Sequence, residues 1–208
     1  MAVWFLLARP LAAADLATRS APPPPRTPIA RATGPTCRPG PPHRVVYPDL
    51  GVDAAVERIG LETDAAAGAG GGAGAAGMLR LGNPTDISRI GWYADGPQPG
   101  SGAGTVLLDG HTYRDGSAVF SEDFPSRAQA GQLVQTVQQD GSVCSYRVDR
   151  VWPAVDAQRD YPHIVASEHL YDRSGPERLF LATCGGRWDA SREDYDDITV
   201  LVASPLHD

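Results

Sequence analysis

A cysteine and a histidine each follow an apolar stretch, a position from which a strand end can display a reactive side chain. Cys184 ends the apolar run of FLATCGGRWDAS and precedes two glycines, while His111 ends the run GTVLLDGHT. A neighbouring histidine or cation lowers the pKa of a thiol and makes it a better nucleophile. If the two runs are neighbouring strands that end on one side, the sequence predicts a cysteine–histidine pair at a sheet rim. The alternative for Cys184 is a small buried hydrophobic residue, since free cysteine is among the most buried residue types.

The elements that must hold this pair are short strands. The clearest pattern is a hairpin over residues 131–151, which turns at Asp140-Gly141 between two alternating runs. Many short strands with irregular connections predict a mostly β protein, a closed or nearly closed barrel with a few short helical turns. The other strands are expected at 44–60, 104–112, 178–183 and 198–204, and the helical turns at 116–122 and 165–170.

Length and composition predict a single domain. A chain of 208 residues with 42% hydrophobic content can bury one full core. The net charge of −7 comes from scattered acids, and no stripe of Lys and Arg follows a phosphate backbone. Nucleic acid is therefore excluded as an expected partner.

The amino end differs in composition from the rest. Residues 1–14, MAVWFLLARPLAAA, contain a short apolar run followed by an A-x-A site, which fits a signal or anchor remnant; a mis-set start or a disordered tail is the alternative. Residues 15–43 are rich in proline and predict a semi-rigid linker, which leaves residues 44–208 as the folded domain. The Gly/Ala-rich segment 65–77 predicts a flexible loop. No later stretch has the ~18 uninterrupted apolar residues of a membrane span, so any membrane attachment would be amino-terminal.

Two longer motifs carry a resemblance to a known family. The segment GWYADGPQPGSGAGTVLLDGHTYRDGSAVF is similar to the region around the catalytic histidine of actinobacterial sortases, and LFLATCGGRWD resembles their strand that ends in Thr-Cys-Gly-Gly. The order of the segments also agrees over about residues 44–204. The chain therefore resembles class E or F sortases or a close relative of those classes. The resemblance implies a sortase β-barrel and a cysteine transpeptidase of the cell exterior, extracellular or tethered to the membrane by its N-terminus.

The resemblance also implies a mechanism. Cys184 would attack the Thr–Gly bond of an LPxTG-type sorting signal, and an amine of a cell-wall precursor or a pilin would resolve the thioacyl enzyme. His111 would protonate the leaving amine and later accept a proton from the incoming one. Thr183 would support the oxyanion or contact the peptide; the alternative is a plain strand residue.

The third catalytic residue of the family is an arginine near the start of the last strand. This chain carries the acids Asp196 and Asp197 there. Arg192, eight residues past Cys184, is the best replacement because its loop could return the guanidinium to the rim, and Arg187 is the second choice. Both arginines could equally be solvated surface charges.

No metal and no cofactor are expected. The remaining histidines lack a second ligand at the spacing that zinc requires: His43, His163, His169 and His207. Three cysteines in an exported chain leave one unpaired, which fits a Cys37–Cys144 disulfide with Cys184 free. A strand-buried Cys144 beside a disordered Cys37 is the alternative.

Three functions remain open from the sequence. The first is a monomeric sortase that joins a sorting-signal protein to an amine, favoured by the intact histidine and Thr-Cys-Gly-Gly motifs. The second is a thiol hydrolase that only cuts such peptides. The third is a catalytically impaired barrel that binds peptide or cell-wall material, favoured by the acids before the last strand.

Overall fold

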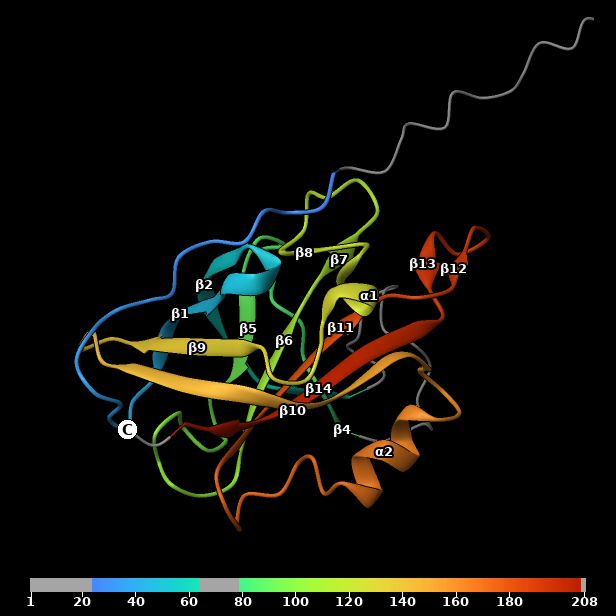
Figure 1. The fold of residues 1–208 in the computed structure, drawn as a ribbon. Coiled ribbons are helices and arrows are strands. Elements are labelled where there is room, and N and C mark those ends of the chain that lie inside the picture. Colours follow the sequence, from blue (N-terminus) through green and yellow to red (C-terminus); the bar gives the residue numbers. More distant parts are fainter. Residues whose placement is uncertain (1–23, 64–78, 207–208) are drawn as a thin grey trace, which may run out of the picture.

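Eight strands close into a barrel in the order β1-β2-β5-β6-β11-β14-β10-β9 (Figure 1). The structure is a computed structural model, and it describes residues 24–63 and 79–206. The fold is mostly β, and the prediction of a closed barrel is confirmed. The barrel strands are β1 (Pro42–Tyr47), β2 (Val52–Ile59), β5 (Ile90–Tyr93), β6 (Thr105–Gly110), β9 (Leu133–Gln138), β10 (Val143–Asp156), β11 (Arg178–Cys184) and β14 (Asp197–Pro205).

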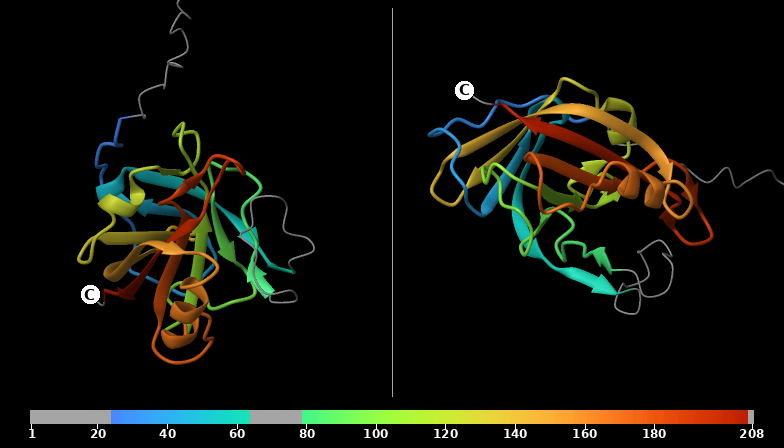
Figure 2. Two further views of the ribbon diagram at one scale, coloured as in Figure 1. Left: turned by 90° about the vertical axis from the view of Figure 1, so that its right-hand side faces the viewer. Right: turned by 90° about the horizontal axis from the view of Figure 1, so that it is seen from below.

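Two apolar clusters cover the inner and part of the outer face of the barrel wall. The inward-facing side chains of all eight strands form the interior core. A second cluster covers the outer face of β6, β11 and β14, and helix α2 (Tyr161–Ser167) packs against it outside the wall (Figure 2). Because these three strands are buried on both faces, their sequences are continuous apolar runs and do not alternate.

Strands β6 and β11 are parallel neighbours in the wall. Their register joins Arg178 to Thr105 and Thr183 to Gly110. The two strands therefore begin at one end of the barrel and finish together at the other. This pairing brings together two strand ends that lie about seventy residues apart in the chain.

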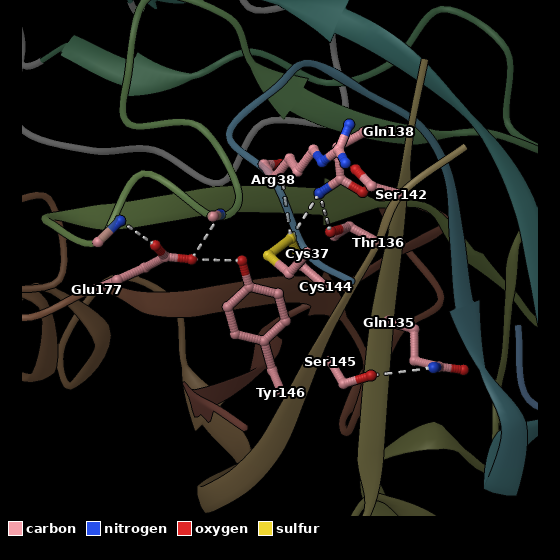
Figure 3. Close-up of a disulfide and its surroundings, with 12 residues drawn as sticks. Cys37, Arg38, Gln135, Thr136, Gln138, Ser142, Cys144, Ser145, Tyr146 and Glu177 are labelled. Carbon is pink, nitrogen blue, oxygen red and sulfur yellow. Dashed lines mark hydrogen bonds between the residues drawn. A yellow bond between two sulfur atoms is a disulfide. The ribbon is translucent and has the colours of Figure 1, made fainter. Parts of the chain in front are cut away.

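A segment that we call the strap, residues 24–41, lies along the outside of the barrel. The Ile29 N–H donates to the carbonyl of Pro48 at 3.0 Å, and the Ala32 N–H donates to the side chain of Gln135 at 2.8 Å. A disulfide joins Cys37 to Cys144 of β10 (Figure 3). The described part of the expected linker thus packs on the barrel, since its backbone groups find partners there.

The connections carry small elements. The hairpin turn at Asp140-Gly141 is as predicted, between β9 and β10. The helices differ from the prediction: α1 covers Phe124–Arg127, after the expected 116–122, and α2 begins four residues before 165. Each helix has a proline in its first turn, Pro125 and Pro162, where its missing N–H costs nothing.

The remaining elements are short. These elements are η1 (Pro48–Leu50), β3 (Leu61–Thr63) with β4 (Leu79–Leu81), β7 (Thr112–Tyr113) with β8 (Phe120–Ser121), and β12 (Trp188–Asp189) with β13 (Asp194–Tyr195). The sequence analysis did not predict these small strand pairs. The segments 1–23 and 65–77 lie outside the described residues.

Candidate active site

The structure places Cys184 and His111 at the same edge of the barrel wall. The last registered pair of β6 and β11 is Thr183 with Gly110, so Cys184 and His111 are the next residues of the two parallel strands. Neighbouring strands lie about 5 Å apart, and residues at equivalent positions point to the same face. Phe180 and Ala182 precede Cys184 in the alternation and belong to the outer cluster. Cys184 therefore faces the outside of the barrel at its rim.

His111 is held by a backbone carbonyl. Its Nε2 lies 2.8 Å from the carbonyl oxygen of Pro84, and its ring is tilted against Tyr113 with centroids 5.9 Å apart. A carbonyl only accepts hydrogen bonds, so Nε2 carries the proton in the neutral ring. Nδ1 is then the ring atom that can accept a proton from a neighbouring thiol.

Cys184 is the free thiol of the described residues, and it is protonated at rest. Burial raises the pKa of this thiol to about 12, and the nearby carboxylates of Asp194 and Asp109 raise it further. At pH 8 the thiol is therefore predominantly protonated. The nucleophile therefore needs a proton acceptor or a change in its surroundings when substrate binds.

The two glycines after Cys184 allow a tight turn. Gly185 and Gly186 have φ angles of 156° and 119°, which side chains rarely adopt. A Cβ on Gly185 would lie 2.9 Å from Cγ of Pro125, and one on Gly186 would lie 2.7 Å from Oδ2 of Asp197. The chain can therefore fold back onto the start of β14 directly behind the thiol.

Asp197 fixes this turn, which gives a structural role to an acid before the last strand. Its carboxylate accepts from the backbone N–H of Arg187 at 2.8 Å and from Nη2 of the same residue at 2.9 Å. The guanidinium of Arg187 also donates to Asp156 at 3.1 Å. Since Asp197 is buried, its pair with Arg187 holds the turn after Cys184 in place.

Arg192 lies in the connection between β12 and β13, paired with two acids. Its Nε donates to Asp189 at 2.9 Å, and its Nη2 contacts the carboxylate of Asp196. These partners hold the guanidinium within its own loop. To reach an oxyanion at Cys184, the guanidinium would have to turn from these partners or use its remaining N–H donors.

Thr183 faces the barrel interior. Its hydroxyl donates to the carbonyl of Gly110 at 2.7 Å and lies 2.6 Å from the hydroxyl of Thr112. The side chain therefore fastens the ends of β6 and β11 together, on the face opposite to Cys184. This geometry supports the role of a strand residue that positions the catalytic strand ends.

Two buried polar groups near the thiol were not singled out in the sequence. Oδ1 of Asp109 and the hydroxyl of Tyr195 are buried without a hydrogen-bond partner in the part of the chain that the structure describes. The Tyr195 ring packs edge-on against Trp188, over which the guanidinium of Arg114 lies 5.2 Å from the ring centroid. The sequence signal for Asp109 is an acid inside the otherwise apolar strand 105–110.

Neither a metal cluster nor a membrane-spanning helix occurs among the described residues. Within 24–63 and 79–206, no three His, Cys, Asp or Glu side chains gather closely enough to hold a metal ion. Neither helix of these ranges reaches the length and apolarity that crossing a bilayer requires.

Comparison with known proteins assigns the domain. The family model of the sortase domain matches residues 48–206. No curated protein matches the sequence significantly. Among solved structures, sortase C1 from Streptococcus suis aligns with a TM-score of 0.52 at 13% identity, over 81% of this chain and 74% of that one. Sortase C-1 from Actinomyces oris aligns at 0.51 and 13%, over 79% and 73%.

A third solved structure is similar over more of its own length. Sortase E1 from Streptomyces coelicolor, with a tripeptide in its active site, aligns with a TM-score of 0.50 at 13% identity. The alignment covers 81% of this chain and 89% of that one. At this level of identity the likeness to all three structures shows the shared fold.

Proposed function

The chain belongs to the sortase family, and on this premise we propose that it cleaves an LPxTG-type sorting signal and transfers the acyl part to an amine. The observation that supports the proposal is the register of β6 and β11, whose last pair is Gly110 with Thr183, the residues that directly precede His111 and Cys184. A thiol and an imidazole at neighbouring strand ends form the smallest set that can make and resolve a thioester.

The proposed reaction has two halves. In the first, the Cys184 thiol transfers its proton to Nδ1 of His111 as sulfur attacks the scissile carbonyl carbon and forms a tetrahedral oxyanion. The C–N bond then breaks, the leaving amine takes the proton from His111, and a thioester remains. In the second, an incoming amine attacks the thioester, His111 accepts its proton, and the thiol is reprotonated when the C–S bond breaks.

The tetrahedral oxyanion requires a hydrogen-bond donor, for which we propose Arg192. The guanidinium would exchange Asp189 or Asp196 for the oxyanion when the peptide binds. Arg187 is the second choice, since its pair with buried Asp197 shapes the turn after Cys184. Thr183 would act on the peptide only through its backbone, because its hydroxyl faces the interior.

The engaged arginines favour one alternative, a barrel that binds the peptide without turning it over. A hydrolase that lets water resolve the thioester is a second form of the same chemistry. The proposed partners of the enzyme are a sorting-signal peptide and a cell-wall or pilin amine, and the proposed working form is a monomer outside the cell. An N-terminal tether to the membrane belongs to the same proposal.

The deciding experiment is detection of the thioester by intact mass. The full chain is incubated with a panel of LPxTG-type peptides, with and without an amine acceptor such as a glycine or lysine peptide. We expect a mass gain on Cys184 that is absent in Cys184→Ala and that the amine discharges into a ligated product. A gain that only water discharges would indicate the hydrolase, and no gain with any peptide would indicate the binding barrel.

The matched variant is His111→Ala. Loss of a positioned acid–base group costs about 10² to 10⁴ in rate, so we expect acylation to fall by at least about 10². Cys144 should not be acylated, because its sulfur is held in a disulfide. Normal acylation by His111→Ala would refute the assignment of the pair.

A further inference from the structure

Asp109 is a buried acid on the outer face of β6, close to the reactive thiol. It lies two residues before His111, and its register partners are Ala182 on β11 and Gly91 on β5. The residue is 7% exposed, and its Oδ1 has no hydrogen-bond partner among the described residues. Strand spacings place its Cα roughly 8 Å from that of Cys184, one strand across and two residues back.

The opposite residue leaves room for this carboxyl group. A Cβ on Gly91 would lie 2.3 Å from Oδ1 of Asp109 and 2.7 Å from Cδ1 of Ile59. Any larger residue at position 91 would displace the carboxyl group from its place. The missing side chain at Gly91 on β5 therefore leaves the space that the Asp109 carboxyl group on β6 occupies.

Among the described side chains, two carboxylates act on Asp109. Burial raises its pKa well above the usual value, and Glu62 and Glu57 raise it further. The carboxylate of Glu57 accepts from the backbone and hydroxyl of Thr85, whereas no such donor reaches Oδ1 of Asp109 from the described residues. A buried carboxyl group without a partner is costly, and a cation that brings its own hydrogen-bond donors removes that cost.

We propose that Asp109 is a specificity residue that binds a lysine or arginine side chain of the sorting peptide, within three residues of the scissile bond. The inference rests on the proposed function and names a property of its substrate. An extended peptide that crosses the rim at Cys184 would bring the side chains near its scissile bond within reach of Asp109. Residues two apart in such a peptide lie about 7 Å from each other, which is close to the distance between Cys184 and Asp109. Glu57 and Glu62 add attraction for the same charge.

Binding of a cation at Asp109 would also act on the nucleophile. The Asp109 carboxylate is one of the groups that raise the pKa of the Cys184 thiol. A lysine or arginine that neutralises it removes this unfavourable field at the moment when the thiolate is needed. A peptide with the correct charge would therefore gain in acylation rate as well as in affinity.

The test compares peptides that differ in one side chain. Lysine, norleucine or glutamate is placed in turn at each position within three residues of the scissile bond of an LPxTG-type peptide, and kcat/KM for acylation of the full chain is measured. We expect one position where lysine exceeds norleucine by about 30-fold or more, the usual effect of a desolvated charge pair. In Asp109→Asn this ratio should fall to within about threefold. Asp194→Asn, which removes another acid near Cys184, should keep it.

Two further measurements separate this inference from the proposed function. Gly91→Ala should reduce the lysine preference like Asp109→Asn, because it displaces the same carboxyl group. Binding of the lysine and norleucine peptides to Cys184→Ala, followed by fluorescence anisotropy, reports recognition even if no peptide acylates the wild type. Equal binding of the two peptides at every position would overturn the role of Asp109, as would a lysine preference that persists in Asp109→Asn. A thioester formed without lysine preference would leave the sortase reaction intact and reject only this inference.

Discussion

Two buried acids lie at opposite ends of the β6–β11 strand pair, and their surroundings differ completely. Glu177 precedes β11, and Asp109 lies near the end of β6; each is 7% exposed. Glu177 accepts from the N–H of Gly100 at 2.9 Å, the N–H of Gly102 at 2.5 Å and the hydroxyl of Tyr146 at 2.6 Å (Figure 3). Oδ1 of Asp109 accepts from no described residue.

The contrast separates two ends of the barrel, a structural end and the end that carries the proposed site, which we call the working end. At the first, donors saturate the acid, and a disulfide closes the strap onto β10 nearby. At the second, polar groups stay unpaired among the described residues, beside a thiol that is protonated at rest. Burial alone therefore does not distinguish the two acids, whereas their hydrogen-bond partners do, because a buried carboxyl group without a partner keeps a desolvation cost that a ligand could offset.

The largest expected effect concerns the disulfide at the structural end. It closes a separation of 107 residues, for which chain entropy gives about 4 to 5 kcal/mol. We expect Cys37→Ser/Cys144→Ser to lose stability on the order of 4 kcal/mol in urea unfolding, measured in a Cys184→Ala background. Reducing agent should destabilise the parent and leave the double variant unchanged. A loss below about 1 kcal/mol would show that the strap is held mainly by its other contacts.

The next effect concerns catalysis at the working end. If Arg192 supplies the oxyanion donor, Arg192→Ala should slow acylation by about 10² to 10³, equivalent to roughly 3 to 4 kcal/mol. Arg192→Lys should recover only part, because an ammonium lacks the forked donors of a guanidinium. Rates are measured by single-turnover mass analysis. Wild-type acylation rates for both variants would contradict this role and point to Arg187 as the oxyanion donor. The acylation rate of Arg187→Ala is then compared with that of the wild type at the same fraction of folded protein.

A smaller effect distinguishes the two acids directly. Glu177→Ala leaves the Tyr146 hydroxyl and two backbone N–H groups without their acceptor, which should cost about 2 to 3 kcal/mol of unfolding free energy. Asp109→Asn should not destabilise the fold, because Oδ1 of Asp109 accepts no hydrogen bond from the described residues. The two free energies are compared by urea unfolding at pH 7. A larger loss in Asp109→Asn than in Glu177→Ala would invert the assignment of the two ends.

The smallest expected effect is a pH dependence. The folded-state pKa of Asp109 lies well above that of the unfolded chain, so the folded state binds its proton longer. Stability then falls as pH rises from the unfolded pKa, about 4, toward the folded one. Relative to Asp109→Asn, the wild type should lose stability between pH 4 and pH 7, as measured by urea unfolding, because the folded state binds the proton more tightly than the unfolded chain. A difference that stays constant with pH would show that the carboxyl group is solvated in the folded protein.

The barrel strands could be predicted from the sequence better than the segments that connect them. Apolar runs and the turn at Asp140-Gly141 located seven of the eight barrel strands, because they depend on local composition, but β5 (Ile90–Tyr93) was missed. The strap could not be anticipated from its prolines, since its attachment depends on donors and acceptors such as Gln135, which lies about a hundred residues away. Each helix has a proline in its first turn, which favours a helix start but does not itself form a helix.

The candidate site shows the same limit. Motif order pointed to Cys184 and His111, and the parallel register pairs the residues just before them, Thr183 and Gly110. The sequence could not show that Arg187 and Arg192 are both paired with acids, or that the Thr183 hydroxyl faces inward. Such facts depend on which face and which loop a side chain joins, and residue type does not specify that.

The strap also sets how the barrel would respond to a mechanical force. Its residues run from the working end, where Arg26 contacts the carbonyl of Ala118, to Cys37 at the opposite end. A pull applied at residue 24 would break the strap's hydrogen bonds one after another and stop at the disulfide. At full extension, the released segment of about 13 residues would reach about 45 Å from Cys37. The disulfide would then carry the load directly into β10 through Cys144.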